Sequence, residues 1–279
     1  MNLFLAILKS IVFGIVEGIT EWLPISSTGH LILLNAFMPL TDNMEFWNMY
    51  KYIIQLGAIM AVIILYFYKL NPWASGKSET EKKNTLRMWL MIAVASVPTG
   101  IVGLALDDFA DEHLNSVTII AVMLIVYGIA FIIVENTRRK PTVRSVSQLT
   151  YQKAFLIGLA QSLAVIPGTS RSGSTILGAS LLGLSRSAAA EFSFFLAIPV
   201  MFGISLLKLI KHAAAVSFGE IVVLLVGMAV SFIVSMIVIR SIMRYVRTHS
   251  FKIFGLYRIV LGVLILILGF AGLLTSVIA

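Results

Sequence analysis

The stretch that best combines reactive side chains lies near the N-terminus, where residues 17–30 read EGITEWLPISSTGH. Glu17 and Glu21 are four residues apart, so on a helix both carboxylates lie on one face and can serve one cavity. His30 titrates near working pH, which makes it a candidate nucleophile or general acid and base. Ser27 is the rival nucleophile, with His30 as its base. The spacing leaves open which of the two attacks.

Hydroxyl-bearing residues gather ahead of two apolar helix patterns, one in 26–29 and one in 167–174. Free backbone N–H groups and hydroxyls at a helix N-terminus favour an anion, and Arg171 in the second stretch adds a planar fork suited to phosphate oxygens. Either stretch alone is typical of ordinary helix caps. If the two stretches face each other, we predict that together they bind a diphosphate. The candidate binding residues are Ser26, Thr28, Gly29, Thr169, Ser170, Ser172 and Gly173.

The composition identifies the class of protein that carries these residues. Apolar residues make up 59% of the chain and charged residues 12%, and the mean hydropathy is +0.97. These values indicate an integral, all-α polytopic membrane protein without room for a soluble domain, so we predict a single membrane domain over 1–279. Apolar runs near the length of about 20 residues that crosses a bilayer predict six full spans. They are 45–68, 88–106, 116–135, 188–210, 219–240 and 252–277.

The net charge of +8 follows from basic residues in short loops between the apolar runs. This pattern indicates membrane topology and no nucleic-acid partner, so loops 69–87, 136–153 and 240–252 are predicted to be cytoplasmic. The acidic loop 107–115 is predicted to lie on the opposite face. Because the chain has no cysteine, it has no disulfides and no cysteine-bound metal. The apolar N-terminus has no basic region before it and no cleavage site, so we expect it to be retained.

Two segments, 1–44 and 153–186, do not read as simple spans. Each holds an apolar helix pattern, a polar break and a second short helix, and sliding by 144 residues aligns them. The aligned pairs include Gly14 with Gly158, Glu17 with Gln161, Ser26 with Ser170, and Gly29 with Gly173. We predict an inverted-topology repeat, about 1–135 and 153–279, in which a re-entrant helix hairpin precedes three spans and the two breaks meet at the midplane. The alternative is that one or both segments cross fully and the similarity is chance.

The two motifs EGITEWLPISSTGH and PGTSRSG, in this order and spacing, resemble the undecaprenyl-diphosphate phosphatase family of the bacitracin-resistance type. The resemblance extends over nearly the whole chain and includes 53–62 and 188–203. It implies a multi-pass phosphatase of the bacterial cytoplasmic membrane whose site opens to the outer face. Such an enzyme hydrolyses undecaprenyl diphosphate to undecaprenyl phosphate and inorganic phosphate, which recycles the lipid carrier for cell-wall peptidoglycan synthesis and confers bacitracin resistance.

Residue by residue, the resemblance implies that Glu17, Glu21, Ser27 and His30 are catalytic in the first motif and Arg171 in the second. It also implies use of Mg or Ca. No metal-binding spacing appears in the sequence, so we expect no protein cage for a metal and a divalent cation carried with the diphosphate, with Glu17 or Glu21 as a ligand. Whether the protein forms a homodimer is left open. The alternative function is a lipid-phosphate flippase that uses the same inverted-repeat site without a nucleophile.

Overall fold

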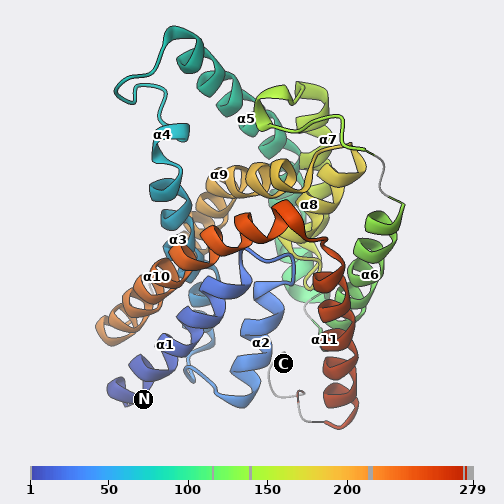
Figure 1. Cartoon of the computed structure of the whole chain (residues 1–279). Helices are drawn as coiled ribbons and strands as arrows, with labels where there is room; N and C mark the ends of the chain where they lie inside the picture. The colour runs from blue at the N-terminus through green and yellow to red at the C-terminus, as the bar shows by residue number, and fades with distance from the viewer. Residues whose placement is uncertain (1, 115, 138–139, 213–215, 273, 275–279) are drawn as a thin grey trace.

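The computed structural model describes residues 2–114, 116–137, 140–212, 216–272 and 274, and this part of the chain folds into helices without a β-sheet. Seven helices are long and apolar enough to cross a membrane. They are α1 (Leu3–Thr20), α3 (Met44–Leu65), α5 (Glu79–Phe109), α6 (Val117–Asn136), α9 (Arg186–His212), α10 (Phe218–Thr248) and α11 (Lys252–Phe270). Six of them coincide with the six predicted spans, except that α3 ends at Leu65 and α11 at Phe270, before the predicted ends at 68 and 277. Residues 273 and 275–277 of the last predicted span lie outside the described residues. The prediction of an all-α polytopic membrane protein is confirmed (Figure 1).

Several helices extend beyond their apolar runs. The helix α5 begins nine residues before the predicted start at 88, and α10 ends eight residues beyond 240. The extension of α5, 79–87, is rich in Glu, Lys and Arg, and that of α10, 241–248, contains two arginines. Neither contains Gly or Pro, so the helical backbone continues into the polar region. The predicted loop 107–115 is also largely helical, because α5 runs into the π-helical turn η1 (Ala110–Leu114). In the basic loop 136–153, Arg138 and Arg139 lie outside the described residues.

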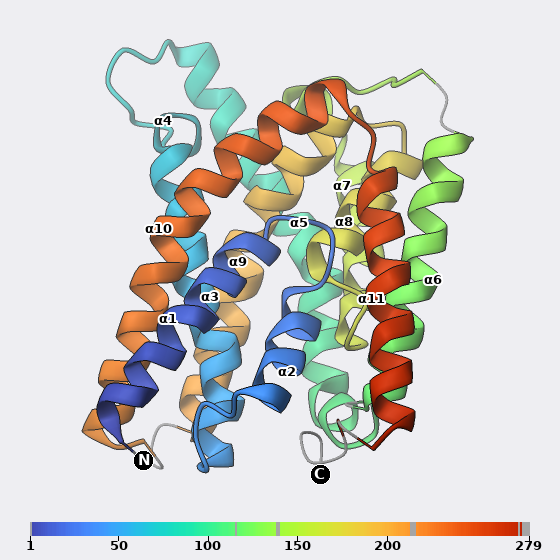
Figure 2. The same cartoon turned by 60° about the horizontal axis from the view of Figure 1, so that its bottom comes forward.

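The two polar breaks connect short helix pairs. The helix α1 is followed by α2 (Ser27–Phe37), and α7 (Tyr151–Ser162) leads through the 3₁₀ turn η3 (Leu163–Val165) to α8 (Arg171–Leu181). Figure 2 shows that α1 and α2 meet halfway through the molecule and that their other ends share its lower side. The pair α7–α8 comes in from the upper side. This is the arrangement that re-entrant hairpins require, although α1 is by itself long enough to span, and the inverted repeat stays a prediction.

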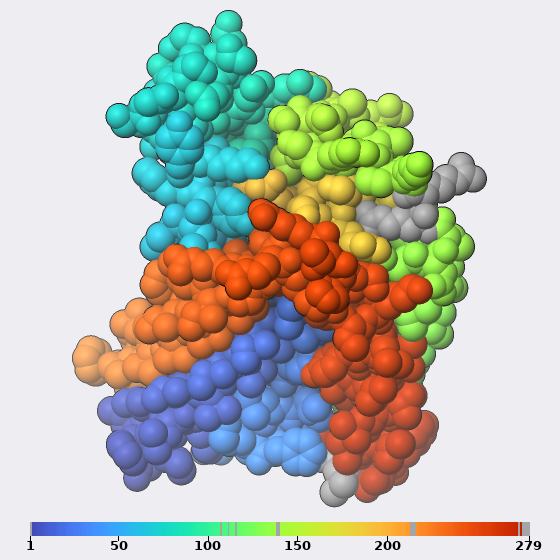
Figure 3. All heavy atoms as spheres, viewed as in Figure 1, coloured from blue at the N-terminus to red at the C-terminus, as the bar shows by residue number. Residues whose placement is uncertain are grey.

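Each hairpin packs on a long helix from the other half of the chain. The helix α1 packs along α10 and α7 along α5, while α3 contacts α9 and α6 contacts α11. Figure 3 shows α1 and α2 filling the angle between α10 and α11. Glycines permit the closest approaches, since a Cβ at Gly14 would lie 2.6 Å from the Gly227 carbonyl oxygen and one at Gly158 only 1.9 Å from that of Ala95. The hairpins are therefore held by helices that belong to the opposite half.

Candidate active site

A serine with a left-handed backbone conformation precedes the second helix of each hairpin. Ser26 has φ 74° and Ser170 has φ 72°, and within the described ranges no other non-glycine residue has a positive φ. Each side chain accepts a hydrogen bond from the N–H of the glycine three residues later, at 3.3 Å for Gly29 and 3.1 Å for Gly173. A non-glycine residue in this region costs about 1–3 kcal/mol, and such strain is frequent at active sites. The sequence indicated serine caps but not their conformation.

A carboxylate, a hydroxyl and a guanidinium meet where the two hairpins face each other. The Ser27 hydroxyl donates to one Glu21 carboxylate oxygen at 2.5 Å, and Arg171 Nη2 donates to the other at 2.8 Å. Arg171 also donates to the Ser193 carbonyl at 3.0 Å. The side chains of Glu21 and Arg171 are only 6% and 11% exposed. A carboxylate bonded to a serine hydroxyl can accept its proton, so this trio has the geometry of an activated nucleophile beside a cation.

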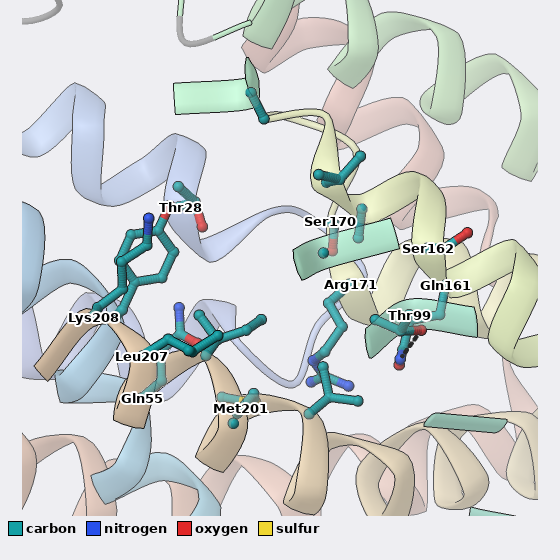
Figure 4. A pocket seen from close by; sticks show the side chains of 18 of the residues that line it. Thr28, Gln55, Thr99, Gln161, Ser162, Ser170, Arg171, Met201, Leu207 and Lys208 are labelled. Atoms are coloured by element: carbon teal, nitrogen blue, oxygen red, sulfur yellow. Dashed lines mark hydrogen bonds between the residues drawn. The ribbon is translucent and has the colours of Figure 1, made fainter. Parts of the chain in front are cut away.

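A cavity of about 550 Å³ lies against this trio, a size typical of small-molecule sites. The expected site residues in its wall are Ser26, Ser27, Thr28, Glu21, Ser170 and Arg171. Figure 4 shows Arg171 between Thr28 on one side and Thr99 with Gln161 on the other. The wall also contains polar residues that the motifs did not indicate: Lys51, Tyr52, Gln55, Ser96, Thr99, Gln161, Ser162 and Lys208. Leucine, valine, isoleucine and methionine side chains supply an apolar part that suits a lipid.

Glu17 lies one helical turn before Glu21, outside the cavity wall. The Glu21 N–H donates to the Glu17 carbonyl at 3.0 Å, so the helical register expected for the two carboxylates is present. The Glu17 side chain is fully buried, and neither carboxylate oxygen has a hydrogen-bond partner in the part of the chain that is described. An unpaired carboxylate at this depth is costly and is a functional candidate by default.

His30 lies behind the tip of the first hairpin. Its Nδ1 lies 2.7 Å from the Ser26 carbonyl oxygen, its Nε2 lies 2.7 Å from the Tyr257 hydroxyl, and its ring stacks on Tyr257 with an interplanar angle of 6°. His30 is absent from the cavity wall, and no hydrogen bond joins it to Ser27. Ser27 is thus hydrogen-bonded to Glu21 and not to His30.

The remaining expected residues support the tips and do not line the cavity. The Ser172 hydroxyl donates to the Leu23 carbonyl at 3.2 Å and so joins the two hairpins. The Thr169 hydroxyl is buried and has no partner among the residues described. Gly29 and Gly173 supply the N–H groups of the two caps. The described residues contain no group of three or more His, Cys, Asp or Glu side chains that could hold a metal.

A buried arginine on α11 ties the two tips together, and the sequence reasoning missed it. Arg258 is fully buried and donates to the Pro24 carbonyl at 3.1 Å in the first break. In the second break it donates to the carbonyls of Gly168 at 2.8 Å and Thr169 at 2.9 Å. The available signal was an arginine in the middle of an otherwise apolar run, which by default marks a functional position in a membrane helix.

Comparison with known proteins agrees with the two motifs. The family model described as bacitracin resistance protein BacA matches residues 10–264. An undecaprenyl-diphosphatase 1 from Oenococcus oeni is 50% identical over 277 residues, which cover 98% of this chain and 100% of that one. An undecaprenyl-diphosphatase from Desulfitobacterium hafniense is 52% identical over 264 residues, covering 94% and 95%. With the family match over most of its length and half of its residues shared with such relatives, this chain belongs to the BacA family of bacitracin resistance proteins.

Proposed function

We propose that this chain is an integral membrane phosphatase that hydrolyses undecaprenyl diphosphate to undecaprenyl phosphate and inorganic phosphate. The observation that carries the proposal is the Glu21 carboxylate, which binds the Ser27 hydroxyl and the Arg171 guanidinium at once in the cavity wall. A flippase needs a binding site but no nucleophile paired with a base, so this trio favours the enzyme. The relatives named undecaprenyl-diphosphatase support the same choice. Recycling the carrier lipid serves cell-wall synthesis and supports bacitracin resistance.

The proposed first step is attack by Ser27 Oγ on the terminal phosphorus while Glu21 takes the hydroxyl proton. The bond between that phosphorus and the bridging oxygen breaks, and undecaprenyl phosphate leaves with the electron pair. Water then attacks the phosphorus of the phosphoserine, and the bond between that phosphorus and Ser27 Oγ breaks. The leaving Oγ takes back the proton that Glu21 holds, which gives inorganic phosphate and restores the Ser27 hydroxyl and the Glu21 carboxylate. The buried Arg171 Nε has no hydrogen-bond partner among the described residues, so it is a donor available to a phosphoryl oxygen as charge develops there.

We assign His30 a positioning role. Both of its ring nitrogens are engaged, one by the Ser26 carbonyl and the other by the Tyr257 hydroxyl. The imidazole therefore holds the backbone immediately before Ser27 against α11. Of the two rival nucleophiles, the contact with Glu21 favours Ser27.

The divalent cation remains part of the proposal. Glu21 lines the cavity, and Glu17 beneath it has two buried oxygens without a partner in the described part of the chain, a donor set that suits a hard cation such as Mg²⁺ or Ca²⁺. These two carboxylates would hold an ion that arrives with the diphosphate. When bound, the ion neutralises part of the charge of the diphosphate. Loss of phosphate release on chelation, with recovery on adding back Mg²⁺, is the expected result.

We further propose that the cavity opens to the outer face of the bacterial cytoplasmic membrane. The basic loops after α4 (Phe67–Leu70), α6 and α10 share the upper side of Figure 2, which the distribution of Lys and Arg makes cytoplasmic. The cavity wall instead includes Ala110, just after the lower end of α5, and Lys208, near the lower end of α9. The wall also includes Gly100, Gly103 and Gly203, where an added Cβ would meet nothing, which supports a lateral route for the lipid tail.

The experiment that tests the function is inorganic phosphate release from undecaprenyl diphosphate by the purified protein. We expect Ser27→Ala and Glu21→Gln each to lower turnover by at least about a hundredfold, the scale of losing one group that acts in the transition state. Ser147→Ala, at an exposed position in the 3₁₀ turn η2 (Val146–Gln148), is the matched control. Turnover that survives in Ser27→Ala would move the attack to another group. If the folded wild-type protein releases no phosphate but moves the lipid across the bilayer of vesicles, the flippase is favoured.

A further inference from the structure

The two breaks turn their backbone carbonyls toward one buried guanidinium on α11. Arg258 Nη1 donates to the Pro24 carbonyl in the first break at 3.1 Å. Its Nη2 donates to the carbonyls of Gly168 at 2.8 Å and Thr169 at 2.9 Å in the second break. In Figure 2 the loop between α1 and α2 lies beside α11 at this level. One side chain thus fixes peptide groups of both breaks.

The surroundings of this guanidinium compensate its charge only in part. Every hydrogen bond that Arg258 makes among the described residues is to a backbone carbonyl, and its guanidinium carbon lies 5.4 Å from the centre of the Tyr127 ring. Burying a cation at membrane depth is costly, and carbonyl dipoles offset the cost less fully than a carboxylate does. An arginine in such a place is a functional candidate.

The first turn of α8 leaves room for this side chain. A Cβ at Gly173 would lie 3.0 Å from Arg258 Nη1, so a larger residue there would press on the guanidinium. The Gly173 N–H donates to the hydroxyl of Ser170, which caps α8. The left-handed conformation of Ser170, with φ 72°, persists only where its surroundings impose it. The bond from Arg258 to the preceding carbonyl, that of Thr169, is such a constraint.

That bond also decides where the next N–H group points. In a planar trans peptide group the carbonyl and the following N–H point in opposite directions, and the described chain contains no cis peptide bond. Because Arg258 holds the Thr169 carbonyl on the α11 side, the Ser170 N–H points away from α11. Ser170 lines the cavity, whereas Arg258 is absent from its wall. The N–H group is therefore directed from the buried arginine toward the cavity.

Of the three peptide groups that Arg258 holds, this one keeps a free N–H. The N–H groups that follow the Pro24 and Gly168 carbonyls donate to nearby backbone carbonyls at 2.8 Å and 3.2 Å. The Ser170 N–H makes no hydrogen bond among the described residues. It directly precedes Arg171, whose Nε also has no partner there. Two fixed and unoccupied donors beside a cavity have the character of an oxyanion hole.

We propose that Arg258 is a positioning residue, which holds the Ser170 N–H toward the cavity as a donor to a phosphoryl oxygen. This inference rests on the proposed phosphatase function. Negative charge develops on the phosphoryl oxygens as Ser27 Oγ attacks the terminal phosphorus, and the Ser170 N–H and Arg171 together stabilise it. Arg258 makes no contact with the substrate. It acts on the transition state through the peptide group between Thr169 and Ser170.

The test compares Arg258→Met and Arg258→Lys with wild type in hydrolysis of undecaprenyl diphosphate and in inhibition by orthovanadate. Vanadate adopts the five-coordinate geometry of a phosphoryl group during transfer, so its affinity reports the donors that act in the transition state. The rise in melting temperature that vanadate causes gives the same comparison without turnover. Arg240→Met, which removes an exposed arginine of α10, is the matched control.

We expect Arg258→Met to lower kcat by about a hundredfold with little change in KM, the scale of a misplaced group in an active site. Vanadate affinity should fall by a similar factor. Arg258→Lys keeps the charge but offers one nitrogen to three carbonyls, so it should recover only part of kcat. If Arg258→Met does not fold, the same measurements on Arg258→Lys decide.

A purely structural role predicts a different result. A destabilised variant contains fewer active molecules, and those that remain bind vanadate as wild type does. A lower kcat with wild-type vanadate affinity would therefore overturn the inference, as would an unchanged kcat or a change in KM alone.

These outcomes are distinct from failure of the proposed function. A folded wild-type protein that releases no phosphate refutes the phosphatase, whereas the effect of Arg258 on an oxyanion site is still judged by the melting shift with vanadate. A wild-type enzyme whose kcat and vanadate affinity do not respond to Arg258→Met or Arg258→Lys retains the phosphatase and refutes the positioning role.

Discussion

The two hairpins share a backbone design but differ in chemistry. Ser26 and Ser170 start their second helices with the same left-handed cap, and the 144-residue shift that aligns these serines also aligns Ser27 with Arg171. The first hairpin thus supplies the hydroxyl and its carboxylate, and the second supplies the guanidinium. Neither hairpin holds the trio alone, so the site exists only where the two tips meet.

The buried polar groups of the hairpins differ in the same way. Gln161, which aligns with Glu17, accepts from Thr175 at 2.9 Å and donates to Thr99 at 3.0 Å. The Glu17 carboxylate has no such partners among the described residues. A satisfied amide stabilises a tip, whereas an unsatisfied carboxylate destabilises it and persists where function requires it. The comparison indicates that, in the proposed mechanism, the first hairpin supplies the nucleophile and its base, whereas the second supplies supporting contacts and Arg171.

Arg171→Lys tests the largest difference between the hairpins. We expect kcat/KM for undecaprenyl diphosphate to fall by about a hundredfold or more, because one ammonium group cannot contact Glu21, the Ser193 carbonyl and a phosphate with fixed geometry. Phosphate release by the purified variant measures it, with Arg144→Lys in an exposed loop as control. Near-normal turnover would show that the second hairpin needs only a positive charge at this position and not the hydrogen-bond geometry of a guanidinium.

Gly158→Ala and Gly14→Ala probe the packing that the hairpins share. A Cβ at Gly158 would lie 1.9 Å from a backbone oxygen and one at Gly14 would lie 2.6 Å away, so both should destabilise by about 1–3 kcal/mol and Gly158→Ala by more. Thermal unfolding in detergent measures the order. Gly203→Ala, where a Cβ meets no atom, is the control. The reverse order would mean that α5 moves away from α7 more easily than α10 from α1.

Glu17→Gln places in the first hairpin the same amide side chain that Gln161 supplies at the aligned position of the second. We expect turnover to fall about tenfold while the melting temperature rises, because a neutral amide is less costly to bury than an unpaired carboxylate. Phosphate release and thermal unfolding of the same preparation measure the two effects. A variant that loses stability instead would show that the carboxylate has a structural partner, such as a bound cation, in the resting protein.

Ser26→Ala and Ser170→Ala address the caps. Each removes the acceptor for the following glycine N–H and keeps a left-handed non-glycine residue, so each should lower stability by about 1 kcal/mol. Ser→Gly at the same positions should cost less, because glycine adopts this conformation freely. Equal effects in thermal unfolding would support equivalent caps, and a clear difference between Ser26 and Ser170 would break the equivalence.

The sequence predicted the parts of this molecule that depend on local pattern. The length of apolar runs located six spans, and the residue types in the two breaks indicated Glu21, Ser27 and Arg171, which meet in the structure. The partner of Ser27 was harder to predict, because Glu21 comes before the bend of the chain and His30 after it, and only the bend decides which faces the hydroxyl. Contacts of Arg258, Lys51 and Lys208 depend on helix packing, which spacing along one chain does not contain.

The contacts of Arg258 have a consequence for movement. Its guanidinium donates to the Pro24 carbonyl in one half of the chain and to the carbonyls of Gly168 and Thr169 in the other, so α11 links the tips of both hairpins. Transporters with inverted repeats work by rocking one half against the other, which changes the distance between their broken helices. We expect this link to oppose such rocking and to hold Ser27 and Arg171 at a constant separation. We therefore expect the two tips to stay fixed relative to each other while the substrate enters and leaves the cavity between them.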